Sequence, residues 1–177
     1  DGIDGLAAST TMIICWIIAF IIFLTSGLND NAIVLLLLGL ACFSFLFFNF
    51  PPATLFMGDS GSLFLGYCLG SLLLMTSLSS EISIWVWLTI LSYFLGDTVS
   101  TTLYRLVKVE FWYDSHRSHA YQNLARIWDS HFYVTLYVSL YQLFWLGPLA
   151  ICSELFNEYE VLIFLLGIIP VIIFNFL

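Results

Sequence analysis

The segment "FMGDSGSLFLGY" (residues 56–67) ends a polar loop and begins a long apolar run. Glycines and serines around one carboxylate, followed by large apolar side chains, are typical of the first turn of a helix. Asp59 is conspicuous here, because only 9% of the chain is charged while 61% is hydrophobic. Soluble domains carry about a quarter charged residues, so this composition predicts an integral membrane protein.

Several apolar runs approach the ~20 residues that a helix needs to cross a bilayer. Hydropathy therefore predicts an all-α fold, a polytopic membrane bundle with about six spans, at residues 6–25, 32–48, 63–78, 82–105, 131–151 and 161–177. No tandem repeat or low-complexity linker separates these spans, so residues 1–177 are predicted to form a single membrane domain. Gly66 and Gly70, spaced as GxxxG, predict close packing against another helix.

The basic residues predict the orientation of the bundle. All of them lie in or beside the segment 106–130: Arg105, Lys108, Arg117 and Arg126. Positive residues flank membrane spans on the cytoplasmic side, so this segment is expected to face the cytoplasm. Counting spans from it assigns residues 1–5 and 49–62 to the same side. Acidic and histidine-containing segments that are far apart in sequence should therefore meet at one membrane face.

Two of these segments contain carboxylates beside glycines. In "DGIDG" (1–5), Asp1 and Asp4 are three residues apart and would share one face of a helix, although Asp-Gly pairs are also common in turns. Asp59 fits two interpretations. It could cap the helix that follows, or bind a divalent cation while the free N–H groups of the turn face a phosphate.

The segment "HRSHAYQ" (116–122) contains the groups that suit anionic oxygens. Arg117 can bind a phosphate through its two-pronged guanidinium, and His116 and His119 can add hydrogen bonds. A solvated basic loop remains the alternative. Zinc is disfavoured because it needs further ligands, and the cysteines lie elsewhere. His131 begins the next span and is interpreted as an ordinary interfacial residue.

Asp97 lies 16 residues after Glu81, the expected outer end of its span. That spacing corresponds to about 24 Å along a helix, which puts Asp97 near the inner boundary of a hydrocarbon layer about 30 Å thick. Thr101 and Arg105 follow on roughly the same helical face. A carboxylate, a hydroxyl and a cation are thus expected in one cleft.

The charges constrain the chemistry at this face. The chain has a formal net charge of −8, yet its carboxylates are predicted to gather beside its few cations. If the ligands are phosphates, the acids would repel them unless a divalent ion intervened. Mg²⁺ held by one or two carboxylates and a diphosphate resolves this conflict. The sequence therefore predicts diphosphate chemistry at a membrane surface.

Taken together, "DGIDGLA", "FMGDSGSLFLG", "GDT" with Arg105, and "HRSHAYQ" resemble the polyprenyl-phosphate N-acetylhexosamine-1-phosphate transferases. The resemblance implies transfer of a sugar-1-phosphate from a UDP-N-acetylhexosamine to undecaprenyl phosphate, with release of UMP and with Mg²⁺ (or Mn²⁺) as cofactor. It also implies a multi-pass protein of the bacterial inner membrane with its active site facing the cytoplasm. Membrane lipids are expected partners and nucleic acids are not.

The resemblance assigns roles to individual residues. Asp59 matches the magnesium-binding aspartate, and Asp1 and Asp4 match acids that line the nucleotide side of the site. The histidine loop matches a phosphate-contacting segment, so His116 and His119 are expected to be catalytic and Arg117 to bind substrate. Asp97 and Arg105 match a less defined polar motif with a substrate-binding role. The loop resembles the branch that initiates O-antigen of lipopolysaccharide more than the peptidoglycan enzyme.

One feature of the family is missing. Its members have an adjacent pair of aspartates on an earlier cytoplasmic loop, and no Asp-Asp pair occurs in these 177 residues. The chain is therefore interpreted as the C-terminal part of a longer transferase, and the 177 residues alone are expected to be inactive. An ion- or proton-coupled transporter is the alternative from a different class, since acids in membrane proteins often mark ion pathways. It would place its charges near the bilayer midplane.

Overall fold

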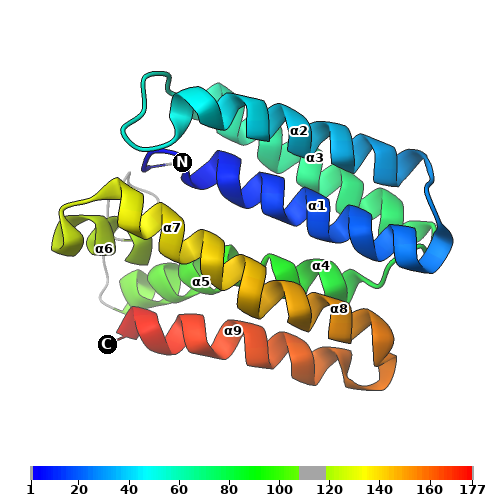
Figure 1. The fold of residues 1–177 in the computed structure, drawn as a ribbon. Helices are drawn as coiled ribbons and strands as arrows, with labels where there is room; N and C mark the ends of the chain where they lie inside the picture. The colour runs from blue at the N-terminus through cyan, green and yellow to red at the C-terminus, as the bar shows by residue number, and fades with distance from the viewer. Residues whose placement is uncertain (1, 108–118, 177) are drawn as a thin grey trace.

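The structure is a computed structural model that describes residues 2–107 and 119–176, and within these residues it is entirely helical (Figure 1). The prediction of an all-α membrane bundle is confirmed. The helices, in chain order, are α1 (Leu6–Ser26), α2 (Asp30–Asn49), α3 (Gly58–Leu78), α4 (Ile84–Ile90), α5 (Ser92–Val107), α6 (Ala120–Trp128), α7 (His131–Tyr141), the π-helical η1 (Gln142–Leu146), α8 (Gly147–Leu155), the short η2 (Asn157–Tyr159) and α9 (Glu160–Phe176).

Among the described residues, four helical segments are long and apolar enough to cross a membrane. They are α1, α2, α3 and the continuous run α7–η1–α8, from His131 to Leu155. Each agrees with a predicted span to within a few residues, except that α3 begins earlier, at Gly58. The predicted spans 82–105 and 161–177 correspond to shorter helices, because the first is divided into α4 and α5 and the second is the 17-residue α9.

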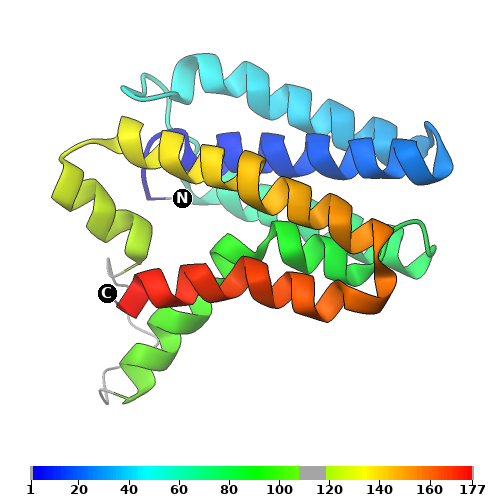
Figure 2. The ribbon, with the colours of Figure 1, turned by 60° about the horizontal axis from the view of Figure 1, so that its bottom comes forward.

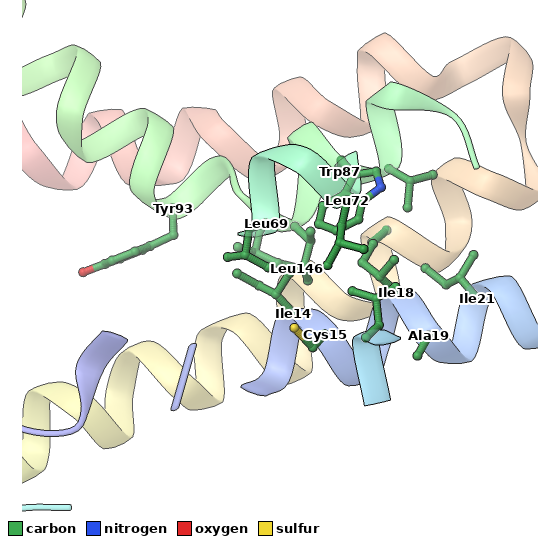
Figure 3. Packing of buried hydrophobic residues seen from close by; sticks show 14 of the residues in the cluster. Ile14, Cys15, Ile18, Ala19, Ile21, Leu69, Leu72, Trp87, Tyr93 and Leu146 are labelled. Carbon is green, nitrogen blue, oxygen red and sulfur yellow. The ribbon is translucent and has the colours of Figure 1, made fainter. Parts of the chain in front are cut away.

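Helix α1 lies at the centre of the bundle. It has buried residues around most of its circumference, whereas α2 and α3 expose many large apolar side chains that suit contact with lipid. Figure 3 shows this core, in which Ile14 and Ile18 of α1 lie near Leu72 of α3, Trp87 of α4 and Leu146 of η1. The core thus joins the first three helices to the second half of the chain.

Two polar side chains of this core, those of Trp87 and Thr76, are hydrogen-bonded within it. Trp87 is fully buried, and its indole Nε1 donates to the Thr76 hydroxyl over 2.9 Å. Thr76 in turn donates to the Leu72 carbonyl over 2.8 Å, so the two polar side chains use a backbone acceptor of their own helix. A buried N–H without a partner costs about 1–3 kcal/mol, and this pair avoids that cost.

The predicted span 82–105 is interrupted at Leu91. Figure 2 shows α5 leaving the direction of α4. Next to the interruption, the Ile90 carbonyl accepts a hydrogen bond from Nε2 of Gln142, a fully buried residue that begins the π-helical η1. Helix breaks inside membrane proteins require such partners, because lipid offers none. The bend gives α5 its own direction, and α5 carries Asp97.

A close approach between helices occurs at Gly39 of α2, where an added Cβ would overlap the indole ring of Trp16 on α1. Small residues allow this spacing between membrane helices. Apart from the adjacent residues and the backbone of α3 itself, no described atom lies within 4 Å of a Cβ placed at Gly66 or at Gly70. The GxxxG prediction therefore finds no packing partner among the helices described, and Gly39 has this role instead.

Gly39→Val should destabilise the protein, because the added side chain must displace the Trp16 ring or separate α1 from α2. Overpacking of this kind costs about 1–3 kcal/mol. Thermal unfolding of the purified protein in detergent measures the effect. Gly66→Val is the matched control, because it makes the same change on a membrane helix at an open position. Equal melting temperatures for the two variants would contradict this account of the α1–α2 contact.

Candidate functional site

The segments that contain the predicted site residues meet at one end of the bundle. Figures 1 and 2 place the N-terminal ends of α1, α3 and α7, the C-terminal end of α2, and the helix α6 at this end. We call it the motif end. Residues 2–5, the loop 50–57 and residues 119–130 all lie there, as the sequence predicts. The opposite end carries the turns before α2 and α4 and the turn after α8.

Asn49, the last residue of α2, joins two of these segments. Its side chain is buried, its Oδ1 accepts from the Gly5 N–H over 3.1 Å, and its Nδ2 donates to the Leu55 carbonyl over 2.9 Å. Gly5 has φ = 74°, a conformation that favours glycine. An added Cβ there would lie 3.2 Å from Pro51. The glycine after Asp4 therefore allows the chain to turn tightly against the loop.

Asp4 is held on two sides. Its Oδ2 accepts from the Ala53 N–H over 3.2 Å and lies 3.3 Å from Nδ1 of His131, the first residue of α7. The Asp4 carbonyl accepts from the Thr135 hydroxyl over 2.7 Å. These contacts link the start of α1 to the loop after α2 and to α7. Asp4 and His131 also line a cavity of about 570 Å³, together with Pro51, Pro52, Ala125, Asp129, Ser130 and Phe132.

A second acid–histidine pair lies between α5 and α6. Oδ2 of Asp97 is 2.9 Å from Nδ1 of His119, which immediately precedes α6. The Asp97 side chain is only 3% exposed, whereas 24% of the His119 side chain is accessible. The carboxylate therefore lies beneath the imidazole, and the imidazole forms the accessible surface of the pair.

Tyr121 packs against this pair. Its ring is stacked on that of His119, with centroids 5.6 Å apart and planes 15° from parallel. Burial, and to a smaller extent the charge of Asp97, raises the pKa of Tyr121, so its phenol stays neutral at physiological pH. The pair and Tyr121 line a cavity of about 220 Å³ with Leu6, Ala7, Phe94 and Thr98. Leu6 and Ala7 directly follow the glycine-rich "DGIDG" segment.

Asp59 occupies the first turn of α3, and its side chain is exposed. It is not the capping residue, since Met57 has that position and makes no side-chain capping bond. A carboxylate in the first turn is favoured by the helix dipole. Within the described residues, no hydrogen bond or ion pair engages the Asp59 carboxylate, so its oxygens are accessible to a ligand.

The chemistry of Asp59 is compatible with Mg²⁺. The described part of the chain contains no group of three or more histidine, cysteine or acidic residues that could enclose a metal. Mg²⁺ is commonly bound by one or two carboxylates plus substrate phosphates, rather than by a cage of protein ligands. One exposed carboxylate at the motif end fits that mode of binding.

The structure does not describe every predicted residue. Asp1, His116 and Arg117 lie outside the described residues, and Arg105 is described only as part of the α5 backbone. Of the predicted residues, the structure brings Asp97 and His119 into contact. The segment 2–5, which contains Asp4, and the first turn of α3, which contains Asp59, lie at the same end of the bundle.

Three further residues were not selected from the sequence: Asn49, Tyr121 and His131. His131 could have been selected, because it begins a helix at the membrane face where Asp4 was also predicted to lie. Tyr121 could also have been selected, because it lies within the "HRSHAYQ" segment (116–122). Nothing in the sequence around Asn49 distinguishes it from other polar residues at a membrane interface.

Residues 1–77 match the sequence model of Glycosyl transferase family 4. No solved structure matches the chain. Two similar curated relatives are phospho-N-acetylmuramoyl-pentapeptide-transferases. That of Moorella thermoacetica is 45% identical over 78 residues, which are 43% of this chain and 24% of the relative. That of Clostridium beijerinckii is 47% identical over 75 residues, 42% of this chain and 23% of the relative.

A third relative matches a longer stretch. The "Probable undecaprenyl-phosphate N-acetylglucosaminyl 1-phosphate transferase" of Bacillus subtilis is 34% identical over 137 residues, which are 74% of this chain and 37% of the relative. The chain therefore spans about a quarter to two fifths of the length of these relatives. The residues that match the family model, 1–77, contain "DGIDG" and "MGDSGS".

Proposed function

We propose that this chain is part of an enzyme that transfers a sugar-1-phosphate from a UDP-sugar to undecaprenyl phosphate and releases UMP. The observation that carries the proposal is that the segments containing Asp4, Asp59 and the Asp97–His119 pair lie at the same end of a membrane helix bundle. Such an end can bind a polar nucleotide-sugar while the helices adjoin the lipid substrate. The names of the relatives support the same reaction.

The reaction is a phosphoryl transfer, in which an oxygen of the lipid phosphate attacks the β-phosphorus of the UDP-sugar and UMP leaves. Positioning and electrostatic stabilisation supply most of the catalysis in such reactions. Mg²⁺ bound to Asp59 would neutralise the charge of the diphosphate. His119 would contact a phosphoryl oxygen from its accessible face, and Asp4, held by Ala53 and His131, would line the side that receives the nucleotide.

The sugar is proposed to be an N-acetylhexosamine and the product to begin a lipid-linked cell-surface glycan such as O-antigen. Both kinds of relative named above act, by name, with N-acetylated amino sugars. The match to the N-acetylglucosaminyl relative continues over 137 residues, whereas the muramoyl-pentapeptide relatives match only 75–78. That difference favours the N-acetylglucosaminyl branch. Activity of the intact protein against a panel of UDP-N-acetyl sugars, with and without Mg²⁺, tests the assignment.

Asp59→Asn in the full-length protein should lower kcat by about 10²–10³-fold, because the amide loses the charge that holds the metal. Membrane insertion should be unchanged. Transfer of radiolabelled sugar to undecaprenyl phosphate, measured over a range of Mg²⁺ concentrations, gives the result. Asp30→Asn is the matched control, since Asp30 is also an exposed first-turn aspartate but begins α2 at the opposite end. Normal transfer by Asp59→Asn would refute the role of Asp59.

His119→Ala should lower kcat by a similar factor, because the imidazole is the accessible group of its pair and is proposed to stabilise phosphoryl charge. Steady-state kinetics of the full-length variant measure the loss, and size-exclusion chromatography in detergent verifies that it is folded. Kinetics equal to those of the unmodified protein would show that the histidine loop takes no part in the reaction.

A further inference from the structure

Among the described acids of the motif end, Asp97 is the most deeply buried. Its side chain is 3% exposed, and its Oδ2 lies 2.9 Å from Nδ1 of His119. A carboxylate buried to this extent needs hydrogen-bond partners to offset its desolvation. Its burial also leaves almost no surface for a large substrate to contact. The exposed part of the pair is the imidazole, at 24%.

We propose that Asp97 is a positioning residue, which fixes His119 so that its Nε2 faces a phosphoryl group of the substrates. This inference rests on the transferase reaction proposed above. The two ring nitrogens lie on opposite sides of an imidazole, so a hydrogen bond from Nδ1–H to Asp97 directs Nε2 away from α5. The partner of one ring nitrogen determines the tautomer and the orientation of the other. When the ring is protonated, both nitrogens donate, one to Asp97 and the other to a phosphoryl oxygen.

Two neighbouring features support this geometry. The stacked ring of Tyr121 restricts the plane of the imidazole, and that phenol is neutral. The adjoining cavity of about 220 Å³ is smaller than the roughly 300–1,000 Å³ that enclose a drug-sized ligand. It suits a single phosphoryl group better than an entire nucleotide-sugar. That group could belong to the diphosphate of the UDP-sugar or to the lipid phosphate.

A double-mutant cycle in the full-length enzyme tests the proposal. Asp97→Asn keeps the size of the side chain but can turn an NH₂ group toward Nδ1. It should lower kcat by about 10–100-fold, the usual cost of losing a partner that orients a histidine. Adding Asp97→Asn to His119→Ala should cause little further loss, because the partner acts only through the imidazole. If the loss of kcat in the double variant equals the product of the two single-variant losses, the proposal is overturned.

The two KM values separate positioning from direct binding. If Asp97 acts through His119, Asp97→Asn should leave KM for both substrates nearly unchanged. A large increase in KM for the UDP-sugar, or for undecaprenyl phosphate, would mean that Asp97 itself binds that substrate, and would overturn the proposal. In His119→Ala, the substrate whose KM rises identifies which phosphoryl group the imidazole contacts. Glu81→Gln is the matched control, since it neutralises another hydrogen-bonded carboxylate, paired with Asn31 at the opposite end.

A spectroscopic measurement keeps the test independent of turnover. In full-length protein labelled with ¹⁵N-histidine, the neutral ring of His119 should carry its proton on Nδ1, and in Asp97→Asn the proton should move to Nε2. His119→Gln assigns the signal. An identical tautomer in both proteins would refute the positioning role, even if the protein transfers sugar phosphate. Lack of transferase activity in the unmodified full-length protein, with the tautomer shift present, would refute the proposed reaction and with it the direction of Nε2 toward its substrates.

Discussion

The buried amide of Asn49 is the interaction on which the arrangement of the motif end depends. It binds the Gly5 N–H and the Leu55 carbonyl at the same time, and so fixes the start of α1 to the loop that leads into α3. Both backbone groups need a partner where lipid and packed side chains exclude water. Asp4 is positioned next to this joint and bonds to Ala53 of the same loop. The "DGIDG" segment and the loop that precedes "MGDSGS" are thereby held together.

A second constraint acts on the other half of the chain. His119 and His131 flank α6, and they pair with Asp97 of α5 and with Asp4 before α1. The short helix α6 is therefore anchored at both ends to acids from separate parts of the fold. Such pairs contribute to order only because their members are partly removed from water; exposed ion pairs contribute about 0–1 kcal/mol. In each pair the aspartate is the more buried member and the histidine is the more accessible one.

The sequence predicted the long helices well, because an apolar run of ~20 residues is itself the physical requirement for crossing a bilayer. It did not predict the interruption at Leu91, since "TILSYF" contains no glycine or proline and the bend involves Gln142, which lies 52 residues away from Ile90. The gathering of motifs at one end could be predicted from the basic residues. The acid–histidine partners could not, because they join residues that are 22 and 127 positions apart and no local pattern in the sequence pairs them.

Because α4 and α5 are separate helices, the position of α5 depends on its contact with α9, a role that the sequence of α9 does not suggest. Gly96, one residue before Asp97, lies so close to α9 that an added Cβ would meet Val171 and Ile168 at 3.0–3.2 Å. Because α5 does not continue the axis of α4, α4 alone does not fix its position. The close contact between α5 and α9 fixes it instead. Residues 161–173 of α9, which are all apolar or glycine and proline, thus pack behind the segment of α5 that carries the buried acid. Truncating the chain before α9 would remove this support and destabilise the position of Asp97.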